Sequence, residues 1–207
     1  MSKLTETIEA VAQMILHEKD YLSDLDAKIG DGDHGINMAR GFGAVLDALD
    51  ELDHTENPKL VLHTVGETIL ENVGGAAGPL YGTAFLRASD ACSEDEKLTI
   101  ASVDRLLGAA IAGIKKRGHA ERGDKTMLDV LIPIHECFTA PYAEGSTLYE
   151  CLADANQAAN EGVEYTKTIA ARKGRASYLG ERSIGCEDPG AVSSMLMFRA
   201  AYQFLNR

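Results

Sequence analysis

The sequence has 207 residues, which is enough for one domain to bury a hydrophobic core without disulfides or a structural metal. Its formal net charge of −12 argues against nucleic acid as the main partner, because phosphate backbones bind to basic faces. With no signal-peptide pattern, no cysteine spacing typical of zinc sites and no apolar run of the roughly 18 to 20 residues that cross a bilayer, we expect one cytoplasmic domain, residues 1–207, that contacts neither membrane nor nucleic acid.

The first predicted helix, residues 2–19, precedes an unusual acidic segment. Residues 26–37 read DAKIGDGDHGIN and contain three carboxylates, Asp26, Asp31 and Asp33. These charges would repel one another at neutral pH unless a cation or water separated them. Magnesium is usually held by a few carboxylates while the phosphates of a nucleotide complete its coordination shell. The segment therefore predicts a Mg²⁺ site.

A calcium-binding EF-hand loop and a solvated turn are two other interpretations of this segment. An EF-hand loop that starts at Asp31 would need glycine at its sixth position and glutamate at its twelfth, where the sequence has Ile36 and Phe42. A solvated turn between two helices stays open on this segment alone. We expect a second helix to begin near Asn37, whose side chain can cap it. The carboxylates would then lie at a helix N-terminus, which also attracts anions.

Pro58 is expected to begin a third helix, and a fourth helical pattern starts near residue 80. The glycine-rich segment 73–79 lies between them. Its small residues allow a backbone to approach a ligand closely, so the amides of Gly75, Ala76 and Ala77 are candidates for a phosphate cradle. Close packing of two helices at a glycine-rich turn explains the same residues and stays open.

A fifth helix is predicted at residues 100–117, which end in three basic residues before Gly118. The next segment, 118–126, almost matches a Walker A loop. However, Asp124 displaces the Lys-Thr pair by one position, and no strand precedes it. Asp124 is instead expected to cap a sixth helix, which Pro133 would kink.

After a seventh predicted helix at residues 146–171, the segment 167–182 carries five basic residues against one acidic residue. A helix C-terminus attracts cations, but this effect does not explain Arg175 or Arg182, which lie beyond a glycine. A basic loop in an acidic chain suits a diphosphate or triphosphate. Asp188 is expected to cap the eighth helix.

Eight helical segments with no convincing strand predict an all-α antiparallel bundle. In an up-down bundle, every second connection lies at the same end. The acidic segment, the glycine-rich turn, the 118–126 loop and the basic segment occupy alternate connections. We therefore expect them to share one rim and to form a nucleotide-phosphate site there.

Taken together, these segments resemble the nucleotide-binding L subunit of bacterial dihydroxyacetone kinase. The resemblance rests on residues 25–38 (LDAKIGDGDHGINM), 73–82 (VGGAAGPLYG), 123–127 (GDKTM), 172–185 (RKGRASYLGERSIG) and 188–191 (DPGA), and it covers nearly the whole chain in the right order. It implies an eight-helix antiparallel barrel with ADP or ATP at one rim. It also implies two Mg²⁺ ions on Asp26, Asp31 and Asp33, and nucleotide contacts from His34, Gly35, Ile36, Asn37, Ala76, Ala77, Gly118, Met127, Arg175, Asp188, Pro189 and Gly190.

Two positions depart from the family pattern. Ala77 stands where the family often has serine, so a hydroxyl toward the phosphate is lost and the backbone amide remains. Cys186 stands where histidine is common, close to the turn at residues 188–190, and this affects contacts to the adenosine rather than the chemistry.

The resemblance also implies the reaction and its partners. Phosphoryl transfer requires mainly alignment and neutralisation of charge, and no residue here is an obvious general base, so no catalytic residue is assigned. A separate K subunit would hold dihydroxyacetone, and a phosphotransferase-system M subunit would rephosphorylate the bound ADP with phosphate that comes ultimately from phosphoenolpyruvate. The alternatives are the L subunit of a split ATP-dependent ketose kinase and a nucleotide-sensing subunit that binds a transcription factor.

Overall fold

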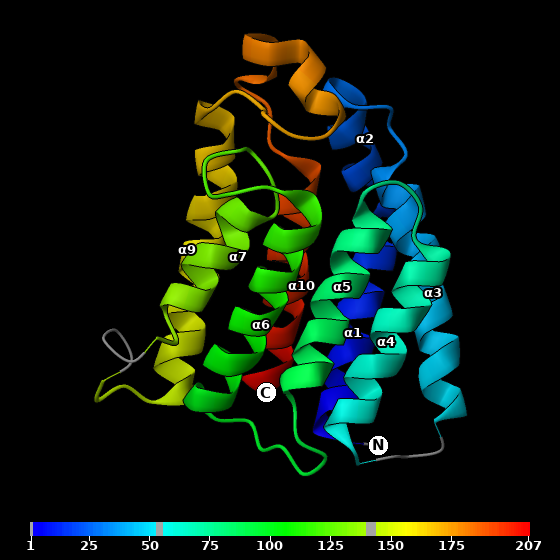
Figure 1. Cartoon of the computed structure of the whole chain (residues 1–207), viewed down its shortest axis with the longest axis vertical. Coiled ribbons are helices and arrows are strands. Elements are labelled where there is room, and N and C mark those ends of the chain that lie inside the picture. The colour runs from blue at the N-terminus through cyan, green and yellow to red at the C-terminus, as the bar shows by residue number, and fades with distance from the viewer. Residues whose placement is uncertain (1, 53–55, 140–143) are drawn as a thin grey trace.

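The computed structural model describes residues 2–52, 56–139 and 144–207. Over these residues it contains helices and no strand, which confirms the all-α prediction. The helices run mostly along the long axis of the molecule (Figure 1). In chain order the elements are α1 (Lys3–His17), α2 (Lys19–Ile29), α3 (His34–Glu51), α4 (Pro58–Asn72), α5 (Ala77–Ala91), α6 (Ile100–Gly118), α7 (Leu128–Glu136), α9 (Leu148–Thr168), the 3-10 helix η1 (Arg175–Ser183) and α10 (Pro189–Leu205).

One large apolar core joins these helices. Ile15, Phe42, Ile69, Leu128 and Val192 come from five different helices and are each fully buried. Helix α10, the last helix of the chain, packs against α1, the first, and also against α7 and α9. Burial of a side chain of this size contributes about 1.5–3 kcal/mol, and this apolar contact holds the bundle together. None of the described helices is long and apolar enough to cross a lipid bilayer.

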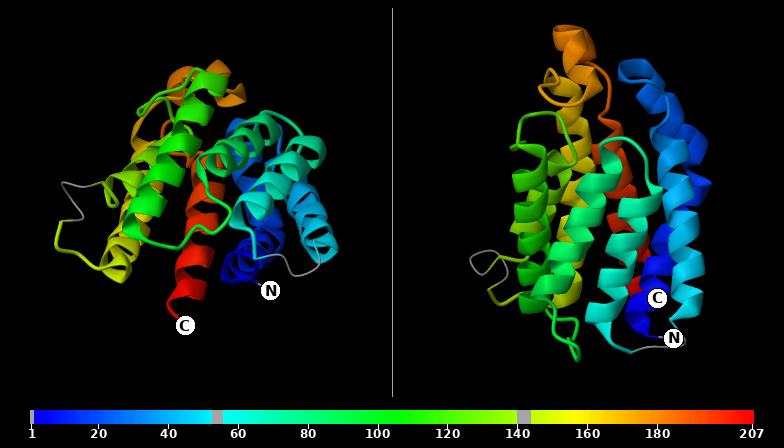
Figure 2. Two further views of the ribbon diagram at one scale, coloured as in Figure 1. Left: turned by 60° about the horizontal axis from the view of Figure 1, so that its bottom comes forward. Right: turned by 45° about the vertical axis from the view of Figure 1, so that its right-hand side comes forward.

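The four segments singled out in the sequence lie at one end of the bundle. The acidic segment, the turn between α4 and α5, the loop between α6 and α7, and η1 all lie at the end opposite the two termini (Figure 1). The two turned views in Figure 2 show the same separation of η1 from the termini. The prediction that alternate connections share a rim is therefore confirmed as a statement about geometry.

Helix α2 was not predicted. Its buried side chains Leu22, Leu25 and Ile29 are spaced by three and four residues, which is a helical pattern, but the segment is short and its second half is acidic. Within the described residues, α2 and the 3-10 helix η1 are therefore helical elements that the sequence analysis did not predict. As a consequence, Asp26 lies in the last turn of a helix and not in a flexible loop.

The prediction that Asn37 caps the next helix is wrong. Helix α3 begins at His34, and Asn37 lies buried in its first turn, where its Oδ1 accepts a hydrogen bond from Arg40 at 3.0 Å. The capping acceptor comes instead from the preceding helix. The Asp26 carboxylate accepts hydrogen bonds from the backbone N–H groups of Asp33 at 3.0 Å and His34 at 3.2 Å.

The predicted cap at Asp124 is also wrong. Helix α7 begins at Leu128, after a loop that is organised by Asp129. The buried Asp129 carboxylate accepts hydrogen bonds from the backbone N–H groups of Gly123 at 2.5 Å and Thr126 at 2.8 Å, while Asp124 accepts one from Glu121 inside the loop. Asp129, in the first turn of α7, therefore accepts backbone hydrogen bonds of the kind that were expected to go to Asp124, before the helix.

The expected helix ends elsewhere are confirmed. Asp188 caps α10 by accepting a hydrogen bond from the Ala191 N–H at 2.7 Å, and Pro189 occupies the first turn. Helix α6 ends at Gly118, followed by a left-handed residue at His119. The second half of the basic segment is not an open loop, since it lies in η1.

Candidate functional site

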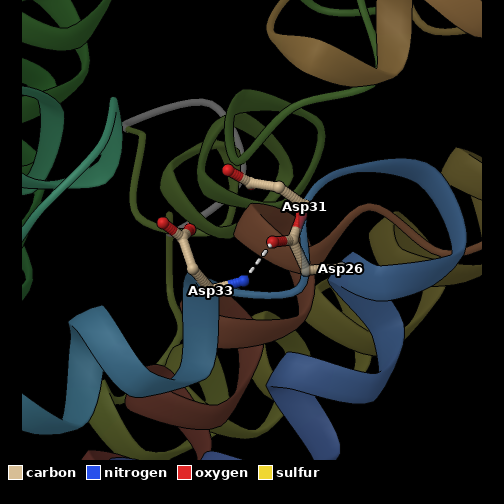
Figure 3. Close-up of side chains that lie close together, drawn as sticks. All are labelled: Asp26, Asp31 and Asp33. Atoms are coloured by element: carbon tan, nitrogen blue, oxygen red, sulfur yellow. Dashed lines mark hydrogen bonds between the residues drawn. The ribbon is translucent and has the colours of Figure 1, made fainter.

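The three predicted carboxylates converge at the junction of α2 and α3. Asp26 lies in the last turn of α2, Asp31 in the connection, and Asp33 immediately before α3. Oxygen atoms from the three side chains lie within 4.8 Å of one another, and Figure 3 shows the carboxyl groups around a common space. Asp31 and Asp33 are exposed and Asp26 is half-buried. Hard divalent cations such as Mg²⁺ prefer this set of oxygen ligands.

The local backbone is built around Asp26. Its two hydrogen bonds from the N-terminus of α3 fix one carboxylate oxygen. A Cβ atom at Gly30 would lie 2.1 Å from the other oxygen, so a side chain at this position would displace the carboxylate. Only glycine leaves room for Asp26 here. The carboxylate is thus held in place in advance of any ligand.

Arg175 reaches the carboxylate cluster from the basic segment. Its guanidinium lies 2.9 Å from Asp31 Oδ2 and forms an ion pair. Both side chains are exposed, and an ion pair of this kind stabilises a fold by about 0–1 kcal/mol, so a ligand can replace it at little cost. The structure therefore brings together Asp31 and Arg175, which the sequence separates by more than 140 positions.

A cavity of about 480 Å³ lies beside this cluster. Its volume is in the usual range for small-molecule sites. The lining includes the three carboxylates and Arg175 as charged groups, and Leu80, Ile114, Ala120 and Met127 as apolar ones. The complete lining is Asp26, Ile29, Asp31, Asp33, His34, Asn37, Gly74, Gly75, Ala76, Ala77, Pro79, Leu80, Ile114, Arg117, Gly118, Ala120, Lys125, Thr126, Met127, Lys173, Gly174, Arg175, Ala176, Asp188, Pro189 and Gly190.

Nearly all of the residues expected to contact the nucleotide or the metal line this cavity. The exceptions are Gly35 and Ile36. A Cβ atom at Gly35 would lie 1.9 Å from the Lys19 carbonyl oxygen, so this glycine allows α2 and α3 to pack closely. Ile36 is 53% exposed and points away from the lining.

Several lining residues were missed by the sequence analysis. Leu80, Ile114 and Ala120 belong to apolar helical patterns that are typical of a core, and no local signal separates them from core residues. Lys125 and Lys173 lie next to predicted residues, and their positive charge in an acidic chain was the available signal.

The glycine-rich turn has a geometry that is compatible with both of the interpretations that the sequence left open. Gly75 has a φ of +66°, and a Cβ atom there would meet nothing within 4 Å, so the glycine is needed for backbone conformation. A Cβ atom at Gly78 would lie 2.1 Å from the Val73 carbonyl oxygen, so this glycine is needed for packing. Helix α5 begins at Ala77, and no side chain accepts a capping hydrogen bond from its first N–H groups. These groups are therefore available to an anion at the cavity wall.

A buried network fixes the imidazole of His34. Its Nε2 lies 3.0 Å from the Ser193 hydroxyl, and that hydroxyl lies 2.8 Å from the buried Tyr81 hydroxyl. The Tyr81 hydroxyl also lies 2.9 Å from the Gly190 carbonyl oxygen, to which it can donate a hydrogen bond, and 2.7 Å from the Ser194 hydroxyl. Burial lowers the pKa of His34 against the opposing effect of Asp26 and Asp33. The ring is therefore neutral at pH 7 and joins α3 to α10.

Asp188 is the titratable group whose environment is most unusual in the cavity wall. Burial raises the pKa of its carboxyl group to about 7, although the Ala191 N–H and the Lys125 ammonium both lower it. A half-protonated carboxyl at neutral pH can still cap α10. Its proton affinity links the stability of this wall to pH.

Comparison with known proteins places this geometry in a family. The model of the DAK2 domain matches residues 28–203. The ADP-binding subunit DhaL of the PEP-dependent dihydroxyacetone kinase of Escherichia coli (strain K12) is 43% identical over 182 residues, which cover 88% of this chain and 86% of that protein. The ADP-binding subunit DhaL of PEP-dependent dihydroxyacetone kinase 1 of Listeria innocua is 45% identical over 191 residues, which cover 92% and 90%.

A solved structure shows the same fold. The dihydroxyacetone kinase from C. freundii, crystallised in complex with AMP-PNP and Mg²⁺, has a TM-score of 0.75 and 25% identity to this chain. The match covers 97% of this chain and 33% of that one, so the chain spans about a third of that kinase's length. The chain therefore belongs to the DAK2 domain family and is related to the L subunits of dihydroxyacetone kinases, as its motifs indicated.

Proposed function

We propose that this chain is the ADP-binding subunit of a dihydroxyacetone kinase, which transfers a phosphoryl group from bound nucleotide to dihydroxyacetone on a separate K subunit. The observation that carries the proposal is the convergence of Asp26, Asp31, Asp33 and Arg175 on one cavity. Three carboxylates would hold cations, and a guanidinium would hold phosphate oxygens. The relatives from E. coli and L. innocua are named as ADP-binding subunits of such kinases.

The residues present fit magnesium. All three side chains offer carboxylate oxygens and no sulfur or imidazole ligand, and Asp26 is held in place by backbone N–H groups. We assign two Mg²⁺ ions to the cluster because the three carboxylates together with the phosphates of a bound nucleotide carry more negative charge than one divalent ion balances. Bound magnesium would supply neutralisation of the charge that spreads over the phosphates in the transition state.

The rest of the nucleotide site follows from the cavity wall. The backbone N–H groups of Ala76 and Ala77 would bind phosphate oxygens at the N-terminus of α5. The apolar side chains of Leu80, Ile114 and Met127 suit an adenine ring on the opposite side. Arg175 would exchange its ion pair with Asp31 for the transferred phosphoryl group, which places positive charge where negative charge develops.

The K subunit would dock at the end of the bundle that carries the cavity. Large apolar side chains are exposed there, with Tyr178 88% and Ile184 48% exposed on the basic segment and Ile36 53% exposed on α3. Aromatic residues on a surface of this kind often dominate the energy of an interface. Because the chain supplies no evident general base, the K subunit would bind and activate the ketose hydroxyl.

The phosphoryl donor distinguishes two versions of this function. In the first version, ADP stays bound and a phosphotransferase-system M subunit rephosphorylates it, in keeping with the relatives that are named as PEP-dependent. In the second version, free ATP exchanges at each turnover, in keeping with the C. freundii kinase that binds AMP-PNP. We favour the first version because this chain matches the PEP-dependent subunits at higher identity and over most of their length.

The direct test is to denature the purified protein and identify the released small molecule by mass spectrometry, and then to assay phosphoryl transfer to dihydroxyacetone with a K-type partner. We expect ADP with magnesium, and transfer that depends on the partner. An empty site that exchanges ATP freely would favour the second version. Absence of nucleotide binding and of transfer would contradict the proposed function.

A further inference from the structure

Lys125 makes unusual contacts for a lysine. Its side chain is buried, with 1% of its surface exposed, and its backbone is left-handed with a φ of 60°. The ammonium donates hydrogen bonds to the carbonyl oxygens of Thr166 at 2.5 Å and Cys186 at 2.5 Å, and it lies 3.4 Å from that of Ile169. Three donors thus meet three backbone acceptors, which is the full capacity of a lysine.

These three carbonyl groups flank the segment that carries Arg175. Thr166 and Ile169 lie where the chain leaves α9, and Cys186 lies just before α10. Between them runs a segment of about twenty residues that includes η1. One ammonium group therefore joins the two ends of this segment to the loop between α6 and α7. We call these two joined ends, residues 166–169 and Cys186, the neck.

Other hydrogen bonds at the neck agree with this arrangement. The Gly185 N–H donates to the Lys167 carbonyl at 2.8 Å, and the Asp188 N–H donates to the Thr166 hydroxyl at 3.1 Å. Beyond the neck, the contact of Arg175 with the carboxylate cluster is one exposed ion pair with Asp31. The residues next to Arg175 also pack on α2, through Ala176 against Ile29, and the Arg172 N–H donates to the Asp124 carbonyl at 3.1 Å. The position of Arg175 therefore depends on the neck together with these contacts.

The arrangement at Lys125 is costly. A buried ammonium is unfavourable, and its burial lowers the pKa of Lys125 although the charges of Asp188 and Asp129 oppose this effect. A left-handed conformation is also unfavourable for a residue with a side chain. Backbone strain of this kind persists only where the surrounding structure enforces it, and it is concentrated at functional sites.

We propose that Lys125 is a positioning residue for phosphoryl transfer, which fixes the neck so that Arg175 stays over the carboxylate cluster. The proposal rests on the proposed function, because it assigns Arg175 to the phosphates. It differs from a purely structural role in one respect: the effect of Lys125 on nucleotide binding passes through Arg175. The Lys125 ammonium contacts the backbone carbonyls of Thr166, Ile169 and Cys186.

The test is a double-mutant cycle with Lys125→Met and Arg175→Ala, read as the dissociation constant of ADP in the presence of Mg²⁺. Each single change should weaken binding by about tenfold, and the double variant should be no more than about twofold weaker than Arg175→Ala alone. Lys59→Met, which removes an exposed lysine near the start of α4 at the far end of the bundle, should leave the constant unchanged. If the two effects instead multiplied, so that the double variant bound ADP about a hundredfold more weakly than the wild type, the proposal would be overturned.

Hydrogen exchange of the ligand-free protein provides an independent measurement. Lys125→Met should increase exchange at least about tenfold across residues 171–185, and the Lys59 variant should not. If Lys125→Met fails to fold, Lys125→Gly keeps the left-handed backbone and leaves space for water to satisfy the three carbonyls. Unchanged exchange in the folded variant would overturn the role of the neck. Wild-type protein that does not bind ADP would instead contradict the proposed function and leave the exchange result to decide on Lys125.

Discussion

Asp31 joins the two charged segments of the site, since its carboxylate belongs to the acidic cluster and also pairs with Arg175. Loss of this carboxylate removes one of the three proposed cation ligands and leaves the exposed connection between α2 and α3 free of packing defects. The exposed Asp24 on α2 offers a matched change in charge outside the cluster.

Asp31→Ala should weaken binding of ADP with Mg²⁺ by at least about tenfold, because a hard cation loses one of its few anionic ligands. Asp24→Ala should leave binding within about twofold. Titration calorimetry measures the affinity, and circular dichroism should show equal helicity in both variants. Undiminished affinity in Asp31→Ala would rule out the metal assignment.

Asp188 makes the stability of the ligand-free protein depend on pH. Burial raises its pKa to about 7, so between its ordinary pKa and pH 7 the folded state binds more protons than the unfolded state. The contribution of this group to stability is therefore greatest in acid and is lost as the pH rises toward and past 7.

Asp188→Asn should abolish this dependence, because asparagine caps a helix without titrating. From pH 5 to pH 7.5, the free energy of unfolding of the wild type should fall by about 1–2 kcal/mol relative to the variant, at about 1.4 kcal/mol per unit of pKa shift before allowance for partial exposure. Urea unfolding at several pH values measures this difference. Parallel curves for the two proteins would refute the assignment.

At the scale of elements, the close contact between α2 and α3 determines where the carboxylates lie. Gly35 allows this contact, since an added Cβ atom would lie 1.9 Å from the Lys19 backbone oxygen, which cannot move independently of its helix. Gly43 lies farther along α3, and a Cβ atom there would meet nothing within 4 Å. The two glycines therefore form a matched pair in one helix.

Gly35→Ala should destabilise the fold by about 1–3 kcal/mol, because it forces two packed helices apart. Gly43→Ala should stabilise it by about 0.5–1 kcal/mol, because alanine favours a helix more than glycine does. Denaturant unfolding measures both values. Equal effects of the two changes would show that α2 and α3 are not packed as described.

The elements and the site differ in how far the sequence predicts them. Asp26, Asp31 and Asp33 lie within eight residues, so their chemistry is visible locally, and most helices show clear apolar spacing. Asp129 follows Thr126 by three residues, which is the spacing of a capping box, so its hydrogen bond from the Thr126 N–H had a local signal. The cap supplied by Asp26 depends instead on which backbone groups the packing of α2 against α3 brings near the carboxylate. Sequence spacing does not contain that information.

The same limit applies to the cavity. Asp188 was recognised as a cap because an Asp-Pro pair before a helical pattern is a local signal. Leu80 and Ile114 could not be distinguished from core residues, since a helix that lines a cavity has the same apolar period as one that lines a core. Lys125 lies in a segment, residues 123–127, that supports the family resemblance but does not itself indicate what the lysine contacts, and its role becomes visible through its distant contacts with Thr166 and Cys186.

At the scale of the whole molecule, the exposed aromatic ring of Tyr178 should contribute to the binding of the K subunit. It lies on η1, at the end of the bundle that carries the cavity. Tyr149 is 56% exposed and lies near the start of α9, away from that end, so it is a matched control.

Tyr178→Ala should weaken association with the K subunit by about thirtyfold, which corresponds to loss of about 2 kcal/mol at an aromatic hot spot, and it should leave ADP affinity unchanged. Tyr149→Ala should change neither quantity. Surface plasmon resonance with the K subunit measures the association. Equal affinities for both variants would place the interface elsewhere.

We propose that the acidic cluster and Arg175 together hold the diphosphate of a magnesium-bound nucleotide, and a crystal structure of the protein with ADP and Mg²⁺ would show this directly. We expect the diphosphate to lie between Arg175 and metal ions coordinated by Asp26, Asp31 and Asp33, with the base against the apolar lining residues. A nucleotide bound elsewhere, or carboxylates that face solvent without metal, would contradict it.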